Sequence, residues 1–215
     1  MKNVIRRIIK ELKEHAPFTL FGALTGMVGM VLCRDMTEPA AYRLFYILHP
    51  MHIVLSALVT ASLYKNYKCK TDKGKCNLFA LLFVGLSGSI VVATLSDSVI
   101  PYLGELLLRM PHAEPHIGFI EEWKIILPLA ATGTIAAYFW PQTKFPHAGH
   151  VLISTWASLF HIIMAKGDTL TLGAGIAIFI FLFLAVWTPC CVSDIVYPLF
   201  FVGDKKKRMK IKNKR

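Results

Sequence analysis

The chain has 215 residues, of which 55% are hydrophobic and 17% are charged, and its mean hydropathy is +0.53. Soluble domains carry about a quarter charged residues, so this composition excludes an ordinary soluble domain and indicates a membrane protein. The length suffices for one unit of about six spans and excludes a large additional catalytic domain. Five cysteines without regular spacing predict no disulfide framework.

The first 15 residues predict a helix that lies on the membrane surface. Val4, Ile8 and Leu12 recur at helical spacing and alternate with basic residues. This pattern is typical of amphipathic helices on anionic headgroups. No small-residue cleavage site follows a short apolar core, so we expect this segment to be retained.

Six runs free of Asp, Glu, Lys and Arg predict six transmembrane helices, because one span needs about 20 apolar residues. The runs cover residues 17–33, 44–64, 77–96, 125–140, 145–165 and 170–191. Open sheets leave backbone groups without partners in lipid, so we expect an all-α integral membrane protein.

Basic residues are distributed unevenly between the predicted loops. Segments 1–16, 65–76, 141–144 and 203–215 hold 19 of the 24 Lys and Arg residues. By the positive-inside rule these segments are cytoplasmic, which predicts a multi-pass protein of the cell membrane with both termini inside. The basic tail is expected to bind anionic lipid headgroups rather than nucleic acid.

The two halves of the chain share a pattern of polar residues. The motif His49-Pro-Met-His52-Ile-Val-Leu-Ser56 matches His147-Ala-Gly-His150-Val-Leu-Ile-Ser154, and Ser-Asp-x-Val-x-Pro occurs at both Asp97 and Asp194. A weaker match aligns Thr25-Gly26 with Thr132-Gly133. Each half has three predicted spans, an odd number, so the second half enters the membrane from the opposite side. This predicts an inverted repeat, with a substrate site between the halves.

The chain therefore divides into five predicted parts. They are an interfacial helix (1–15), a first three-helix repeat (16–108), an external loop rich in His and Glu (109–124), a second three-helix repeat (125–202) and a basic tail (203–215).

The repeated residues are the candidate metal ligands. Residues spaced by three and seven positions share one face of a helix, and polar faces are expensive in lipid, so both faces are expected to point inward. The candidate set is His49, His52, Ser56 and Asp97 from one half, and His147, His150, Ser154 and Asp194 from the other. We expect the first set near the outer membrane face and the second near the inner face. The alternative is packing, with hydroxyls bonded to their own helices.

Three further groups are weaker candidates. Cys190 and Cys191 carry thiols that suit soft metals. The second group consists of three possible accessory ligands, His112, His116 and His161. The first two belong to the loop rich in His and Glu, which either concentrates cations at the surface or is an ordinary solvated loop. The third group is Cys69 and Cys76, which are either incidental cysteines or a metal-handling pair; a structural disulfide between them is disfavoured, because their loop is predicted to lie in reducing cytoplasm.

Together these features favour a small secondary transporter or channel for a divalent or transition-metal cation, with proton coupling as a further option. The alternatives are a redox protein that binds haem through pairs such as His52 with His161, or His15 with His147 or His150, and a membrane-embedded metal-dependent enzyme. Signatures of phosphate-driven pumps and familiar hydrolases are missing, which favours transport over catalysis. The bilayer, the cation and a second copy of the chain are the expected partners.

Overall fold

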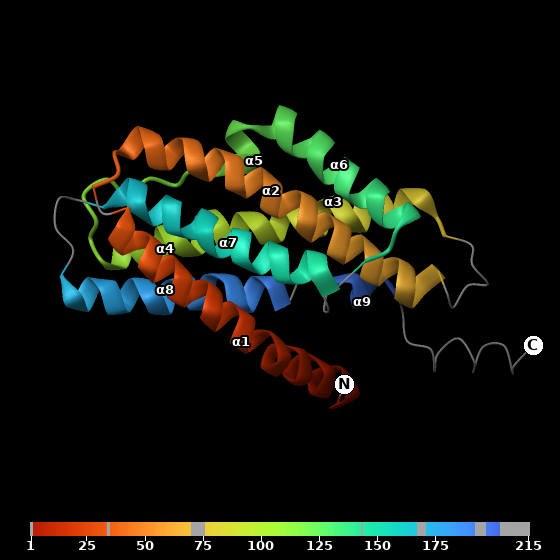
Figure 1. Ribbon diagram of the computed structural model, residues 1–215. Coiled ribbons are helices and arrows are strands. Elements are labelled where there is room, and N and C mark those ends of the chain that lie inside the picture. Colours follow the sequence, from red (N-terminus) through yellow and green to blue (C-terminus); the bar gives the residue numbers. More distant parts are fainter. Residues whose placement is uncertain are drawn as a thin grey trace, which may run out of the picture.

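Figure 1 shows a computed structural model that describes residues 2–33, 35–69, 76–142, 144–166, 171–191 and 197–202. Within these ranges the regular elements are helices and no strand occurs, so the predicted all-α class is confirmed. The helices are α1 (Lys2–Leu32), α2 (Glu38–Tyr64), α3 (Leu78–Thr94), α4 (Ile100–Leu107), α5 (Gly118–Glu121), α6 (Trp123–Phe139), α7 (Lys144–Ala165), α8 (Leu172–Cys191) and α9 (Tyr197–Val202). Two π-helical turns, Lys65–Cys69 and Leu95–Val99, follow α2 and α3.

The distribution of polar and apolar residues is that of a membrane protein. Four helical segments are long and apolar enough to span a bilayer, namely Glu38–Lys68, Leu78–Leu107, Ala148–Ala165 and Gly173–Cys190. The apolar helices Ala16–Leu32 and Trp123–Phe139 are shorter, so six spans stay a prediction. Phe79 is 84% exposed and Leu107 is 72% exposed, while Asp97 and Glu105 are buried. Such an arrangement suits a lipid environment and not water.

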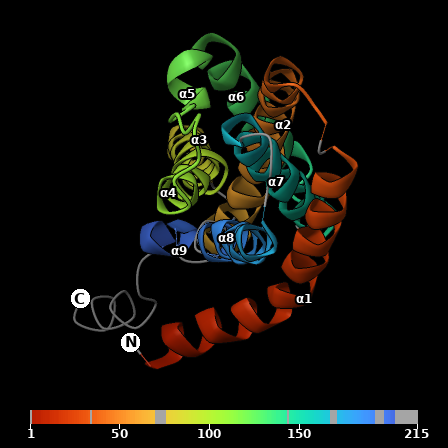
Figure 2. The same ribbon diagram turned by 90° about the vertical axis from the view of Figure 1, so that its left-hand side faces the viewer.

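Helix α1 differs from the prediction of a surface helix followed by a separate span. It is one helix from Lys2 to Leu32, with Pro17 inside it. Proline removes one backbone hydrogen bond, but a long helix can continue through it with a bend. The N-terminal part extends away from the other helices (Figures 1 and 2). Most side chains before residue 16 lie outside the described part, so the amphipathic surface stays a prediction.

Helices α2 and α7 form the centre of the bundle and contact each other most extensively. Helices α6 and α3 pack against α2, and α1 and α8 pack against α7 (Figure 2). This arrangement places the two His-rich faces of the sequence next to each other.

Glycines allow the helices to approach closely at two crossings. A Cβ at Gly133 of α6 would lie 2.3 Å from the carbonyl oxygen of Val54 and 3.1 Å from Cβ of Ala57, both in α2. On the other side of the bundle, a Cβ at Gly22 of α1 would lie 2.8 Å from Oγ1 of Thr155 in α7, whereas one at Gly26 would make an ordinary contact, 3.4 Å from Cγ2 of the same residue. Such small residues are common where membrane helices pack without a hydrophobic driving force.

The segment that carries Asp97 is a long helix interrupted by a π-helical turn. Asn77 caps the N-terminus of helix α3: its side-chain oxygen accepts from the backbone N–H of Phe79 at 3.0 Å and of Ala80 at 3.4 Å. Pro101 lacks an N–H donor, and just before it the Ile100 N–H bonds to the Leu95 carbonyl, one residue farther back than in an α-helix. The helix therefore passes through a local π-helical turn just before Pro101. Turns of this kind are frequent at functional sites.

The prediction for Cys76 is wrong, because Cys76 is disulfide-bonded. Its partner lies outside the described side chains, while Cys33 and Cys190 are not disulfide-bonded. The prediction rested on the assumed cytoplasmic location and not on geometry. Disulfides persist in oxidising compartments, so this bond opposes the orientation that the basic residues favour.

Candidate metal centre

Asp97 is fully buried and lies at the centre of a polar network. Its Oδ2 atom lies 2.9 Å from Nδ1 of His49 and 2.7 Å from Nδ1 of His52. Its Oδ1 atom accepts hydrogen bonds from the hydroxyls of Ser96 and Ser154, each at 2.7 Å. Each carboxylate oxygen therefore has two hydrogen-bond partners. These partners offset the cost of burying the charge in a low-dielectric interior.

This arrangement determines which imidazole nitrogens remain available. An ionised carboxylate only accepts hydrogen bonds, so Nδ1 of His49 and of His52 each donates to Asp97. In a neutral imidazole the Nε2 atom then keeps its lone pair. Neither Nε2 atom has a hydrogen-bond partner among the described residues, and both are buried. A carboxylate that orients a histidine in this way is typical of the surroundings of metal sites.

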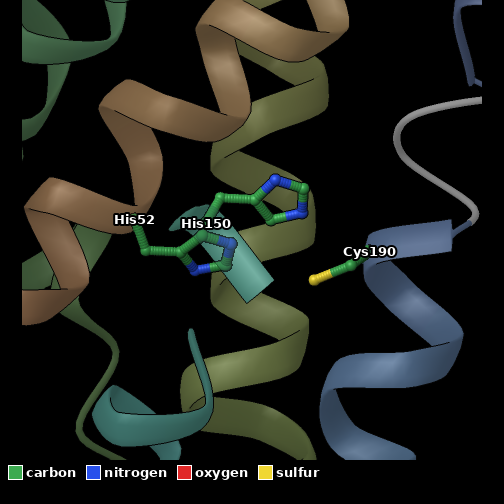
Figure 3. Close-up of side chains that lie close together, drawn as sticks. All are labelled: His52, His150 and Cys190. Atoms are coloured by element: carbon green, nitrogen blue, oxygen red, sulfur yellow. The ribbon is translucent and has the colours of Figure 1, made fainter. Parts of the chain in front are cut away.

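His52 shares its surroundings with His150 and Cys190, and we call these three residues the metal centre. Their ligand atoms all lie within 4.8 Å of one another, and all three residues are buried. The rings of His52 and His150 are nearly parallel, at 10°, with centroids 5.6 Å apart. The residues come from α2, α7 and α8, and the Cys190 sulfur points toward the two imidazoles (Figure 3).

Two imidazoles and a thiol are ligands for zinc or another borderline or soft cation. Ligand atoms around tetrahedral zinc are about 3.4–3.7 Å apart, so the three side chains would have to approach one another by up to about 1.4 Å to hold an ion. Three protein ligands leave a fourth position open. Open positions are found where a ligand must exchange, whereas purely structural zinc sites have four protein ligands.

Two serines of α7 form hydrogen bonds to the π-helical turn that carries Asp97. The single proton of the Ser158 hydroxyl is shared between the carbonyls of Ser96, at 2.9 Å, and Ser154, at 2.8 Å. The Ser154 hydroxyl also lies 3.2 Å from that of Ser96. Because α7 holds the turn in this way, the carboxylate is placed between α2 and α7.

The two candidate sets are not separated at opposite faces, as the sequence suggested. His52 lies against His150, and Ser154 bonds to Asp97, so residues of both halves meet in one place. The expectation failed because it placed each residue by its distance from the end of a straight span. The close contact of α2 with α7 along their lengths brings the sets together instead.

Other predicted residues have different surroundings. Ser56 is buried, and its hydroxyl has no partner among the described residues. His112 is exposed on the loop. Three predicted side chains lie outside the described part of the chain, those of His147, Cys191 and Asp194. The roles predicted for them stay predictions.

One buried pair was missed from the sequence. Glu105 of α4 and His161 of α7 are both buried, with Oε1 and Nδ1 2.7 Å apart. Glu105 falls inside the first predicted repeat (16–108) but beyond the charge-free run that ends at residue 96, so the sequence did not identify it as a buried carboxylate. The available signal was a single acidic residue inside an apolar stretch that continues to Leu107.

Comparisons with protein-family models, with curated proteins and with solved structures found no significant match to this chain. What can be stated of its function rests on the buried residues. The protein is helical, and four of its helical segments are long and apolar enough to span a membrane. It contains a buried His/Asp network and a buried His/His/Cys group that could hold a metal ion.

Proposed function

We propose that the chain is a membrane transporter or channel for a transition-metal cation, and that the cation binds at His52, His150 and Cys190. The observation that carries the proposal is the convergence of three buried ligand atoms from three helices within 4.8 Å. Asp97 is the orienting carboxylate for His52 and His49, and not a direct ligand, since its oxygens already accept hydrogen bonds from four groups.

Transport is favoured because the ligands lie inside the bundle and belong to helices of both halves. The inverted repeat is part of this proposal. Gly133 packs against Ala57, and Gly26 packs against Thr155. Ala57 and Thr155 are equivalent under the same offset that aligns His52 with His150, so matched glycines contact matched positions. A site between two such halves can open alternately to either side.

A membrane-embedded metal enzyme is the second candidate, because three ligands and an open position also characterise catalytic zinc sites. For the haem hypothesis the surroundings of the histidines offer less support. His161 pairs with Glu105, and His52 pairs with Asp97 and lies against His150. A purified protein with a Soret band would establish haem.

Cobalt binding tests the centre directly. Co²⁺ bound to a thiolate has a sulfur-to-metal charge-transfer band, which we expect in the purified protein and expect to be lost in Cys190→Ser. Cys33→Ser is the matched control, since Cys33 is the other cysteine of the described side chains that forms no disulfide, and it lies in the loop after α1. A band that survives in Cys190→Ser would reject the centre.

Transport is tested separately in proteoliposomes loaded with a zinc indicator. We expect His52→Ala and His150→Ala each to abolish zinc uptake, with His112→Ala, on the exposed loop, as the control. Folded yield must be compared first, because loss of His52 also leaves Asp97 short of a partner. Metal binding without any uptake would favour the enzyme over the transporter.

A further inference from the structure

A second group of buried polar atoms lies away from the metal centre. Glu105 and His161 form a close pair through Oε1 and Nδ1, yet Oε2 of Glu105 and Nε2 of His161 have no hydrogen-bond partner among the described residues. Both side chains are fully buried. His161 lies eleven residues after His150 in the same helix, which corresponds to about 16 Å along its axis. The pair is therefore separate from the metal centre.

The pair repeats the arrangement around Asp97. When Glu105 is ionised it accepts a hydrogen bond from Nδ1 of His161, as Asp97 does from His52, and Nε2 of His161 then keeps its lone pair. A buried acceptor without a partner loses its hydration without compensation, which disfavours a purely structural role for this geometry. A cation bound at Nε2 removes that cost.

Further ligands approach His161 from the loop between α4 and α5. The rings of His116 and His161 are 5.8 Å apart in an edge-to-face arrangement. His116 is 19% exposed and lies 3.9 Å from a Glu114 carboxylate oxygen and 3.8 Å from one of Glu121. Glu114 is 72% exposed, so cation-binding groups continue from the surface to the buried pair.

The loop is held over this end of α7. The His112 N–H donates to the Ala165 carbonyl at 3.3 Å, and the Met110 N–H donates to the Glu105 carbonyl at 2.9 Å. These bonds connect the loop to the two helices that carry Glu105 and His161. The loop therefore holds His116 next to the Glu105–His161 pair.

A connection toward the Asp97 network is also present. Phe45 lies between His161 and His49, with its ring 5.3 Å from each. Gly118 of α5 covers His49, since a Cβ at Gly118 would lie 2.8 Å from its Nε2 atom. The loop and α5 thus adjoin both groups of histidines.

We infer that His161 and His116 form a second binding site for a divalent cation, with Glu105 as the positioning residue and the loop carboxylates as the way in. Imidazole and carboxylate ligands suit zinc, cobalt or manganese, and this second site contains no thiol. A role of this second site in transport rests on the proposed function. Cation binding at the site does not depend on it.

The test is a titration of the purified full chain with Co²⁺, in which bound metal and absorption are measured together. We expect two equivalents, one with the thiolate charge-transfer band and one without it. His161→Gln and His116→Ala should each weaken the equivalent without the band at least tenfold, and Glu105→Gln should weaken it about 10–100-fold. The thiolate band should not change in these variants, which a general loss of structure would not allow.

The control is His112→Ala, which removes an exposed histidine of the same loop. His116 is partly exposed, so its variant remains informative if His161→Gln fails to fold. Binding of a single equivalent that carries the band, or a second equivalent unchanged in both His116→Ala and His161→Gln, would overturn the inference. Absence of the band together with one His161-dependent equivalent would reject the metal centre and leave this site standing.

Discussion

Replacement of Asp97 by Asn tests whether this carboxylate acts through His52. Asn has nearly the same shape but carries one acceptor oxygen and one NH₂ group, while four groups point hydrogen-bond donors at Asp97. Hydroxyls can reverse their role and accept from the NH₂ group, so the amide oxygen should face the two imidazoles and the nitrogen should face Ser96 and Ser154. The fold should therefore tolerate the change.

The expected decrease in metal affinity follows from the loss of the negative charge beside His52. The distance from Nδ1 to Oδ2 is 2.7 Å, which is a short, charge-assisted hydrogen bond. Loss of such a partner lowers metal affinity by about 10–100-fold, or roughly 1.4–2.7 kcal/mol. Asp97→Glu should be intermediate, because it restores the charge but adds a methylene to a closely packed position.

Cobalt titration at the thiolate band measures this affinity directly. Ser154→Ala is the matched control, since it removes one donor to Asp97 and leaves both histidine contacts intact. That control should lower the free energy of unfolding by about 1.5–3 kcal/mol, as for a hydrogen bond to a charged group, and leave cobalt affinity within a few fold. Wild-type affinity in Asp97→Asn would refute the idea that this carboxylate tunes the metal ligands.

Three further predictions concern helix packing, membrane orientation and the effect of bound zinc on stability. Gly133→Ala should lower the apparent melting temperature in detergent, because its Cβ meets the Val54 carbonyl, whereas Gly173→Ala, with no atom within 4 Å, should not. Maleimide applied to intact cells should label a cysteine introduced at Glu114 and not one at Lys70; the reverse result would assign the basic loop to the outside, where the Cys76 disulfide fits. Zinc at 100 times its Kd should stabilise the fold by about 2.7 kcal/mol, and a melting curve that zinc leaves unchanged would contradict binding to the native state.

Much of the helical architecture could be predicted from the sequence, because it depends on local properties. Runs without charge identify the long apolar helices, and the spacing of His49, His52 and Ser56 places them on one helix face, which the structure buries. Pairing across helices is different. His52 and Cys190 are 138 residues apart, and only the crossing of α2, α7 and α8 brings them together.

Glu105 shows why the extent of a span is harder to predict than its existence. A search for charge-free runs ends at the first acidic residue, so it treats Asp97 as a helix end. In the structure Asp97 lies within a π-helical turn and the helix continues past Glu105 to Leu107. Both carboxylates are buried by residues of other helices, which the sequence of this segment does not specify.

The three histidines that bond to Asp97 and Glu105 share one feature that argues for a cation ligand rather than for packing alone. His49, His52 and His161 each use Nδ1 for a carboxylate and leave a buried Nε2 without a partner among the described residues. A structural histidine gains most when both nitrogens are satisfied, and three unsatisfied acceptors cost about 3–9 kcal/mol together. That sum is comparable to the whole stability of a typical fold. Only a hydrogen-bond donor or a cation can engage these lone pairs, and for His52 the neighbouring imidazole and thiol are the partners that a metal ion requires.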